Sequence, residues 1–197
     1  MCNGSIQNRS KEWISSSFLE FKKHQASLLF IVWDEEDGGR IECRQLRPIL
    51  CALFPSDGVA KGTPSSSTAK RIVGGEVFTL REIREACITA AGEPWSQHRM
   101  ITLNEMFAIM DALWADGERR TRMVRACLHS VFTSFFGEQE EVTKVALMKA
   151  SQRVTGTSIG AGEAESILRT AATNNSTYDT LNFEKFCELL LPTLTQE

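Results

Sequence analysis

An acidic run that follows the first long apolar segment has the residue types and the spacing to hold a hard metal cation. Residues 34–45 read DEEDGGRIECRQ. In a calcium loop of this kind, oxygens at positions 1, 3, 5, 7, 9 and 12 surround the ion, and a glycine at position 6 permits a sharp turn. In that register the six ligand positions carry Asp34, Glu36, Gly38, Arg40, Glu42 and Gln45. The pattern predicts a calcium loop.

Two of these positions depart from a strong calcium site. Gln45 stands where a glutamate would bind the ion through both oxygens, and Gly38 offers no side-chain oxygen. We therefore expect calcium to bind weakly or not at all, and we expect no other cofactor. A solvated acidic turn is the alternative interpretation. Gly39 and Ile41, at positions 6 and 8 of the register, favour a vestigial metal loop.

The apolar periodicity predicts that helices hold this loop at both ends. Apolar residues recur at three- and four-residue steps across residues 10–33 and again across residues 46–53, so each segment has an apolar face. No segment shows the sustained alternation of apolar and polar residues that is typical of a strand. The sequence therefore predicts an all-α fold. On the first helix we expect these residues to share the buried face: Trp13, Phe18, Phe21, Leu29, Phe30 and Trp33.

The unit of helix, turn and helix recurs along the chain. Further apolar helical segments flank three more turns, at residues 80–88 and 106–113, 128–135 and 145–148, and 164–171 and 186–190. A degenerate repeat of this kind indicates units that bury their apolar faces against one another. We expect two lobes, at residues 10–116 and 117–197. Residues 55–76, rich in Ser, Gly, Thr and Pro, are predicted to form a flexible linker within the first lobe.

The ends of the later turns resemble the loop endings of the EF-hand superfamily. In the segment MITLNEMFAIM, Ile101 stands where one hand pairs with its neighbour, and Glu105 stands at the last loop position. In YDTLNFEKFCELL, Leu181 stands at the pairing position. Residues 101–148 are similar in layout to the central region of the calcineurin B, neuronal calcium sensor and calaxin group.

This resemblance implies both a fold and a set of strand pairings. The fold would consist of four EF-hand-like helix–loop–helix units paired into two lobes. Short backbone pairing would join Ile41 with Ile101 in the first lobe and Val142 with Leu181 in the second.

The three later loops lack the acidic start of a calcium loop. Relative to a standard loop, the second (residues 92–105) and the fourth (residues 172–185) are about two residues longer, and the third is about one residue shorter. None offers the six to eight oxygen ligands that calcium takes. We expect no calcium in these loops.

No pattern of catalytic residues accompanies the loops. The three histidines, His24, His98 and His129, are isolated in the sequence. The sequence also lacks a phosphate-binding glycine loop, a serine-centred elbow and a paired carboxylate motif. We expect a protein that is not an enzyme.

Methionine and aromatic side chains suit a surface that accepts a helix of a partner protein. The candidates are Met106, Met110, Phe132, Phe135 and Met148. The alternative is that each of them is a core residue. The predicted function is a non-catalytic adaptor or structural subunit of a larger complex, which captures an amphipathic helix largely without calcium. A calcium sensor that uses the first loop, or a regulatory subunit of a phosphatase or kinase, are the alternatives.

Charge and hydropathy argue against other classes of partner. The formal net charge is only −3, with acidic and basic residues mixed, so we expect no surface for nucleic acid. No apolar run approaches the roughly 20 residues that span a bilayer. The N-terminal segment also lacks the basic and apolar stretches of a secretory signal. We expect a cytoplasmic protein, and the resemblance to calaxin implies a complex of the cytoskeleton or of the cilium or flagellum.

Overall fold

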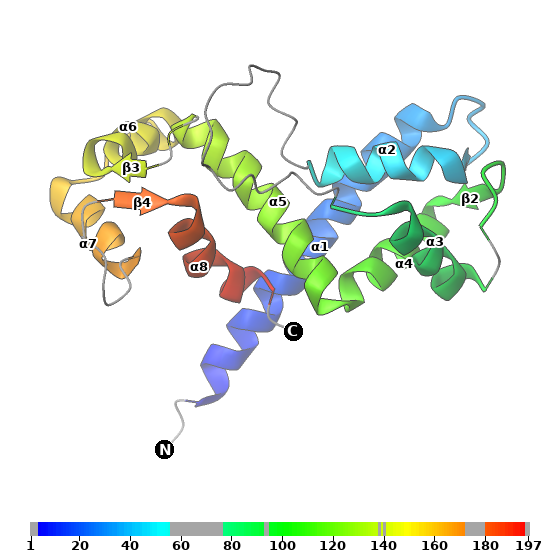
Figure 1. Ribbon diagram of the computed structural model, residues 1–197, viewed down its shortest axis with the longest axis horizontal. Coiled ribbons are helices and arrows are strands. Elements are labelled where there is room, and N and C mark those ends of the chain that lie inside the picture. Colours follow the sequence, from blue (N-terminus) through cyan, green and yellow to red (C-terminus); the bar gives the residue numbers. More distant parts are fainter. Residues whose placement is uncertain are drawn as a thin grey trace, which may run out of the picture. The chain divides into compact units, whose positions relative to one another are not determined.

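The computed structural model describes residues 4–55, 77–92, 95–137, 139, 141–171 and 180–195 (Figure 1). Residues 4–17 are described by their backbone alone. The predicted linker at residues 55–76 lies outside the described residues except for its first residue, and so does most of the predicted fourth loop.

Helices make up most of the described chain, as the sequence predicts. They are α1 (Gly4–Trp33), α2 (Cys43–Leu53), α3 (Leu80–Ala91), α4 (Leu103–Ala115), α5 (Gly117–Phe136), α6 (Lys144–Thr155), α7 (Ala161–Ala171) and α8 (Phe183–Leu194). Short strands lie between them: β1 (Arg40–Glu42), β2 (Met100–Thr102), β3 (Glu141–Thr143) and β4 (Thr180–Asn182). Every predicted helical segment lies within one of these helices. In the described part of the chain, no helix is long and apolar enough to cross a membrane.

Each strand passes directly into a helix, and this joint has the same form four times. The middle residue of the strand is buried and its neighbours are more exposed, because successive side chains of a strand point to opposite faces. Strand β1 pairs antiparallel with β2, where Ile41 lies opposite Ile101, and β3 pairs with β4, where Val142 lies opposite Leu181. Both predicted pairings are confirmed.

The last residue of each strand determines where the following helix begins. Thr102 Oγ1 accepts a hydrogen bond from the backbone N–H of Glu105 at 3.3 Å, and Asn182 Oδ1 accepts one from the backbone N–H of Lys185 at 2.9 Å. Short polar side chains are favoured here because they satisfy an N–H group that has no partner inside the helix. The buried strand residue and the helix start are therefore fixed relative to each other.

The chain forms two compact units. Unit 1 comprises Met1–Cys127 with Leu194–Glu197, and unit 2 comprises Leu128–Thr193. Unit 1 thus contains the sheet of β1 and β2, and unit 2 contains the sheet of β3 and β4. The units divide within α5, whereas the sequence places the division between residues 116 and 117. The interruption of the helical pattern between α4 and α5 looks like a boundary between lobes in the sequence. The first half of α5, however, belongs to unit 1.

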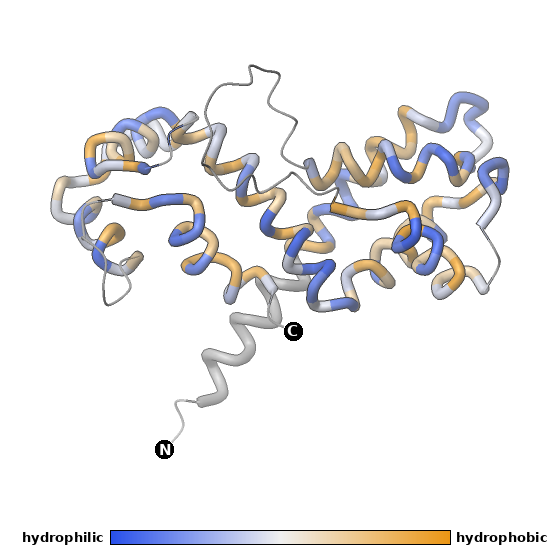
Figure 2. The backbone as a smooth tube through the Cα atoms, viewed as in Figure 1, coloured by the Kyte–Doolittle hydropathy of each residue, from blue (hydrophilic) through white to orange (hydrophobic). Residues whose placement is uncertain are grey.

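Unit 1 has a core of mainly aliphatic and methionine side chains, together with the buried rings of Phe54 and Phe78. Helix α3 packs along α4, and α1 contacts both α2 and α4. Hydrophobic and hydrophilic residues intermix along these helices in Figure 2, as expected for helices with one buried face. The large side chains with almost no exposure include Ile41, Leu46, Ile49, Leu50, Ile83, Ile101, Met106, Ile109, Met110 and Leu113.

Unit 2 has a smaller core with phenylalanine rings at its centre. The ring centroid of Phe132 lies 5.0 Å from that of Phe136, 5.7 Å from that of Phe183 and 5.4 Å from that of Phe186. Aromatic pairs at such distances attract one another beyond the effect of buried area. The buried cluster consists of Phe132, Phe136, Val142, Ala150, Leu168, Ala171 and Leu181. Phe132 therefore ties α5 to α8.

The prediction of which residues form the buried face of α1 is wrong for Phe21. Phe30 is 4% exposed, whereas Phe21 is 57% exposed. Since each residue of an α-helix turns the chain by about 100°, nine residues place these two side chains on opposite faces. Phe21 and Phe30 each lie three or four residues from another apolar residue, because α1 carries apolar residues on two faces. Spacing alone therefore does not show which of the two is buried.

Candidate functional site

The first loop is closed at its start by Asp34. Its carboxylate accepts hydrogen bonds from two backbone N–H groups, that of Gly38 at 3.0 Å and that of Gly39 at 2.7 Å. Asp37 and Gly39 have positive φ angles of 51° and 68°, the left-handed conformation that glycine adopts without steric cost. Asp34 thus holds the turn through hydrogen bonds within the protein.

Gln45 closes the same loop at its end. Its Oε1 accepts a hydrogen bond from the backbone N–H of Glu42 at 2.7 Å, and its Nε2 donates one to the carbonyl of Trp33 at 3.4 Å. A glutamate carboxylate at this position has no hydrogen to donate to Trp33. The amide therefore links the end of α1 to the start of α2.

The other predicted ligands of this loop have different surroundings. Three of them are exposed, namely Glu36, Gly38 and Arg40. The carboxylate of Glu42 forms an ion pair with Arg44 and lies 3.4 Å from Nδ1 of His98. Among the residues that the structure describes, no group of three or more His, Cys, Asp or Glu side chains is placed to hold a metal ion.

The second loop contains a positive charge of its own. Arg99 Nη2 donates to Oε1 of Glu105 at 2.8 Å, and the two side chains are only 14% and 33% exposed. The other carboxylate oxygen of Glu105 accepts hydrogen bonds from the N–H and the hydroxyl of Thr102, at 2.8 and 3.0 Å. The carboxylate of Glu105, at the predicted last position of the loop, therefore already binds Arg99 and Thr102, the residue before α4.

This arrangement predicts a pH dependence for the stability of unit 1. Hydrogen bonds from Thr102, together with the charge of Arg99, lower the pKa of Glu105 from its ordinary value of 4.5. A carboxyl group with a lowered pKa stabilises the fold at pH values above its unfolded pKa, and this stability is lost as the pH falls through the folded pKa. Glu105→Gln should therefore lower the melting temperature at neutral pH but have a diminishing effect in acid.

The measurement is thermal unfolding of the wild type and Glu105→Gln, followed by tryptophan fluorescence, at a series of pH values from about 7 down to about 3. Tryptophan reports on unit 1 because all four tryptophans of the chain lie before residue 128. A difference in melting temperature that stays constant over this range would exclude a role for the carboxylate charge.

Glu105 is the third residue of a helix that follows a strand, and the equivalent position holds no carboxylate in α2, α6 or α8. Gln45, Glu105, Ala146 and Lys185 are each the third residue of such a helix. Lys185 Nζ donates to the carbonyl of Thr180 at 3.4 Å. The four equivalent positions thus carry an amide, a carboxylate paired with arginine, a methyl group and an ammonium group.

The residues predicted to contact a partner lie in different environments. Met106 and Met110 are fully buried in unit 1, so both pack inside that unit, which is the alternative that the sequence allowed. Phe132 is 4% exposed and belongs to the core of unit 2. Phe135 and Met148 are partly exposed in unit 2, and they stay candidates for contact with a partner.

Unit 2 also exposes apolar side chains that the sequence analysis did not single out. Leu147, Phe183, Phe186 and Leu189 pack against the core of unit 2 and stay partly exposed. They come from α6 and α8. Periodicity marks them as apolar helix positions, but it does not distinguish a residue in the middle of a core from one at its edge.

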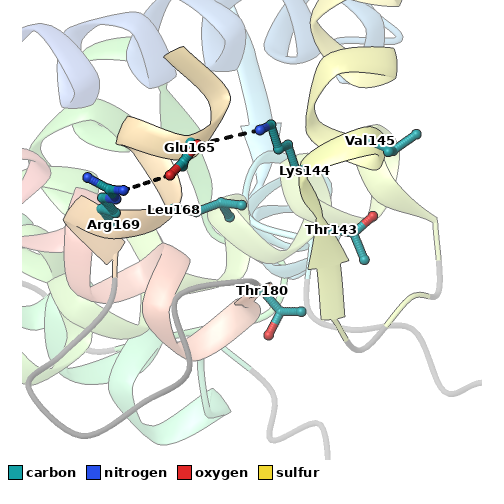
Figure 3. Close-up of a pocket in the computed structure, with 7 residues that line it drawn as sticks. All are labelled: Thr143, Lys144, Val145, Glu165, Leu168, Arg169 and Thr180. Atoms are coloured by element: carbon teal, nitrogen blue, oxygen red, sulfur yellow. Dashed lines mark hydrogen bonds and ion pairs between the residues drawn. The ribbon is translucent and has the colours of Figure 1, made fainter. Parts of the chain in front are cut away.

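A pocket of about 950 Å³ lies in unit 2 beside the start of α6 and the end of α7 (Figure 3). In its lining, Glu165 forms an ion pair with Lys144 of α6 at 3.5 Å, and another along α7 with Arg169 at 2.7 Å. The rest of its lining consists of Thr143, Val145, Leu168 and Thr180. Among the described residues that line the pocket, the carboxylate of Glu165 is engaged by two cations and neither histidine nor cysteine occurs, so these residues offer no nucleophile paired with a base.

Among proteins of known structure, several chains are similar to this one. No family model matches the chain, and no curated protein matches it. A structure described as "Chaetomium theromophilum TREX2 CID domain complex" contains a chain that is similar to this one with 15% sequence identity and a TM-score of 0.47. The match covers 86% of this chain and 88% of that chain. At this level of similarity it supports no conclusion about function.

Proposed function

We propose that this chain is an EF-hand-like adaptor or structural subunit that works largely without calcium. It would consist of four helix–loop–helix units in two pairs, and it would hold an amphipathic helix of a partner within a larger complex. The four strand–helix joints of the same form and the two antiparallel pairings support this architecture. Its proposed setting is the cytoplasm, in a ciliary or cytoskeletal complex, as the resemblance to calaxin implies.

The observation that carries the proposal is the chemistry at the last position of each loop. A strong calcium loop needs a glutamate there that binds through both oxygens. Gln45, Ala146 and Lys185 offer no carboxylate, and the carboxylate of Glu105 already pairs with Arg99. A calcium ion would have to displace the guanidinium in the second loop, and like charge would repel it from the ammonium group in the fourth.

Helix capture is supported by the partly exposed apolar side chains of unit 2. An amphipathic helix binds by laying its apolar face against such a surface. Phe135, Met148, Phe186 and Leu189 are four of the residues that offer it. Phenylalanine and methionine suit this role because both bury a large area, and methionine adapts its shape to the partner.

The two buried thiols of unit 1, those of Cys43 and Cys87, are poor candidates for a catalytic nucleophile. Burial raises the pKa of Cys43, and it raises the pKa of Cys87 to about 12. At neutral pH both groups are therefore protonated, and the thiol is a much weaker nucleophile than the thiolate. These two cysteines serve as apolar core residues.

Calorimetric titration of the metal-stripped protein with calcium, in the presence of magnesium, tests the independence from calcium. We expect no binding heat at calcium concentrations up to roughly 10⁻⁵ M, the range in which calcium sensors respond. A binding event in that range that disappears in Asp34→Ala would contradict the proposal and would favour a sensor that uses the first loop.

Affinity purification of the tagged protein in calcium and in chelator tests the capture of a partner. The same partner should be retained under both conditions, and Met148→Lys should reduce its retention because a charge enters the apolar surface. Val154→Lys is the matched control, since Val154 lies on the same helix and is 58% exposed. Release of the partner by chelator, or equal retention by the two variants, would count against the proposal.

A further inference from the structure

Helix α1 has a second apolar face, which is exposed in unit 1. Leu19, Ala26 and Phe30 form the face that is buried in the core. The exposed face carries four large apolar residues, of which the exposed fractions are 57% for Phe21, 56% for Leu28, 70% for Ile31 and 75% for Val32. A helix that is apolar all round is normally buried all round.

These four residues form one stripe, which we call the α1 stripe. Phe21 and Leu28 are seven residues apart, or about two helical turns, and Ile31 and Val32 follow Leu28 by three and four residues. Residues at such spacings lie above one another on one side of a helix. An exposed patch of this kind marks a site of interaction more often than a single exposed hydrophobic residue does.

The α1 stripe ends at an acidic loop. Glu35, Glu36 and Asp37 are exposed, and within the described part of the chain no ion pair involves their carboxylates. Arg40, which is also exposed, offsets one of these three charges. The surface beyond the C-terminal end of the stripe is therefore negative.

Lys22 and Lys23 of α1 do not offset this charge, because both interact within unit 1. Lys22 Nζ donates to the carbonyl of Leu53 at 2.8 Å. Lys23 Nζ forms ion pairs with Asp111 at 2.7 Å and with Glu20 at 3.0 Å. A partner that covers the α1 stripe thus meets an apolar surface with negative charge at its end.

We propose that the α1 stripe is a docking surface for an amphipathic helix of a partner protein, with lysine or arginine residues at the end that meets the acidic loop. The apolar face of this helix covers the four stripe residues, and its basic end pairs with Glu35, Glu36 and Asp37. Negative charge at this place also disfavours an anionic membrane, which attracts basic segments. This surface goes beyond the proposed function, because it lies in unit 1 and contains none of the apolar residues of unit 2 named above.

The probe for this proposal is a synthetic helical peptide that carries a stripe of leucines and a cluster of lysines at one end, labelled with fluorescein. Its binding to the full chain is measured by fluorescence anisotropy. A second peptide carries glutamates in place of the lysines. We expect saturable binding of the lysine peptide and roughly tenfold weaker binding of the glutamate peptide, because like charges then meet at the loop.

Variants of exposed residues locate the binding site. Leu28→Gln combined with Ile31→Gln should weaken binding of the lysine peptide by roughly tenfold or more, because two apolar side chains leave the interface. Glu35→Lys combined with Glu36→Lys should weaken it in a way that diminishes at high salt. The matched control is Val154→Gln, whose side chain is 58% exposed in unit 2.

Further outcomes would overturn the proposal. Unchanged affinity in the α1 variants, or loss of binding in Met148→Lys alone, would assign the peptide to unit 2. A dimer in sedimentation velocity that Leu28→Gln converts to a monomer would make a second copy the occupant. Absence of peptide binding together with binding to vesicles of phosphatidylcholine and phosphatidylserine would make it a membrane contact. Circular dichroism checks that each variant is folded.

Discussion

The combination of Gly38→Asp and Gln45→Glu is expected to give the first loop a measurable affinity for calcium. It adds carboxylates at positions 5 and 12, where a strong loop needs them. No atom lies within 4 Å of a Cβ placed at Gly38, so the aspartate fits without a clash. With Asp34, Glu36 and Glu42 in place, the dissociation constant should fall to roughly 10⁻⁵ M or below, the range of calcium sensors.

Calorimetry and thermal unfolding would measure this gain. Gln45→Glu removes the hydrogen bond to Trp33, so the metal-free variant should be less stable than the wild type. Calcium at about 100 times its dissociation constant should then restore about 2.7 kcal/mol of stability. Gly162→Asp with Gln152→Glu is the matched control, since it adds the same side chains in unit 2, outside the strand–helix joints.

Failure of this substitution to create a site would speak against the EF-hand proposal itself. A loop of unrelated origin has no reason to place five carboxylates and a carbonyl around one point. If the variant folds but binds calcium no better than the control does, then the match of residues 34–45 to a calcium loop is a coincidence of spacing.

The strand pairings could be predicted from the sequence because the resemblance to EF-hand loop endings implies them. One aliphatic residue, followed by a capping residue, followed by an apolar helical period, describes Ile101 and Thr102 as well as Leu181 and Asn182. Two such joints in one lobe leave their strand edges unpaired unless they meet. Ile41 therefore pairs with Ile101, and Val142 with Leu181.

Contacts between distant side chains could not be predicted in this way. Nothing in the sequence distinguishes Arg99 from the other arginines, yet its guanidinium lies 2.8 Å from Glu105. The amide of Gln45 reaches Trp33 only because the loop brings the ends of two helices together. The burial of Met106 and the exposure of Phe21 likewise depend on which helices pack against α4 and α1.

Phe132→Ala is expected to destabilise unit 2 by about 3–5 kcal/mol, because it removes a buried aromatic ring and leaves a cavity. Three other phenylalanine rings lie within 5.7 Å of this ring, and the core of unit 2 is small. Unit 1 should keep its stability. Circular dichroism follows the loss of helix, and tryptophan fluorescence follows unit 1, where all four tryptophans lie.

Val131→Ala provides the control, because Val131 is the adjacent residue of α5 and is 40% exposed. A substitution at such a position should change the free energy of unfolding by less than about 1 kcal/mol. If Phe132→Ala has an effect as small as that of Val131→Ala, then Phe132 is not the centre of the core. A simultaneous loss of both units would mean that they fold as one.

If unit 2 alone unfolds and the partner is released, the adaptor holds its partner through unit 2. Retention of that partner by the intact unit 1 would instead point to the α1 stripe.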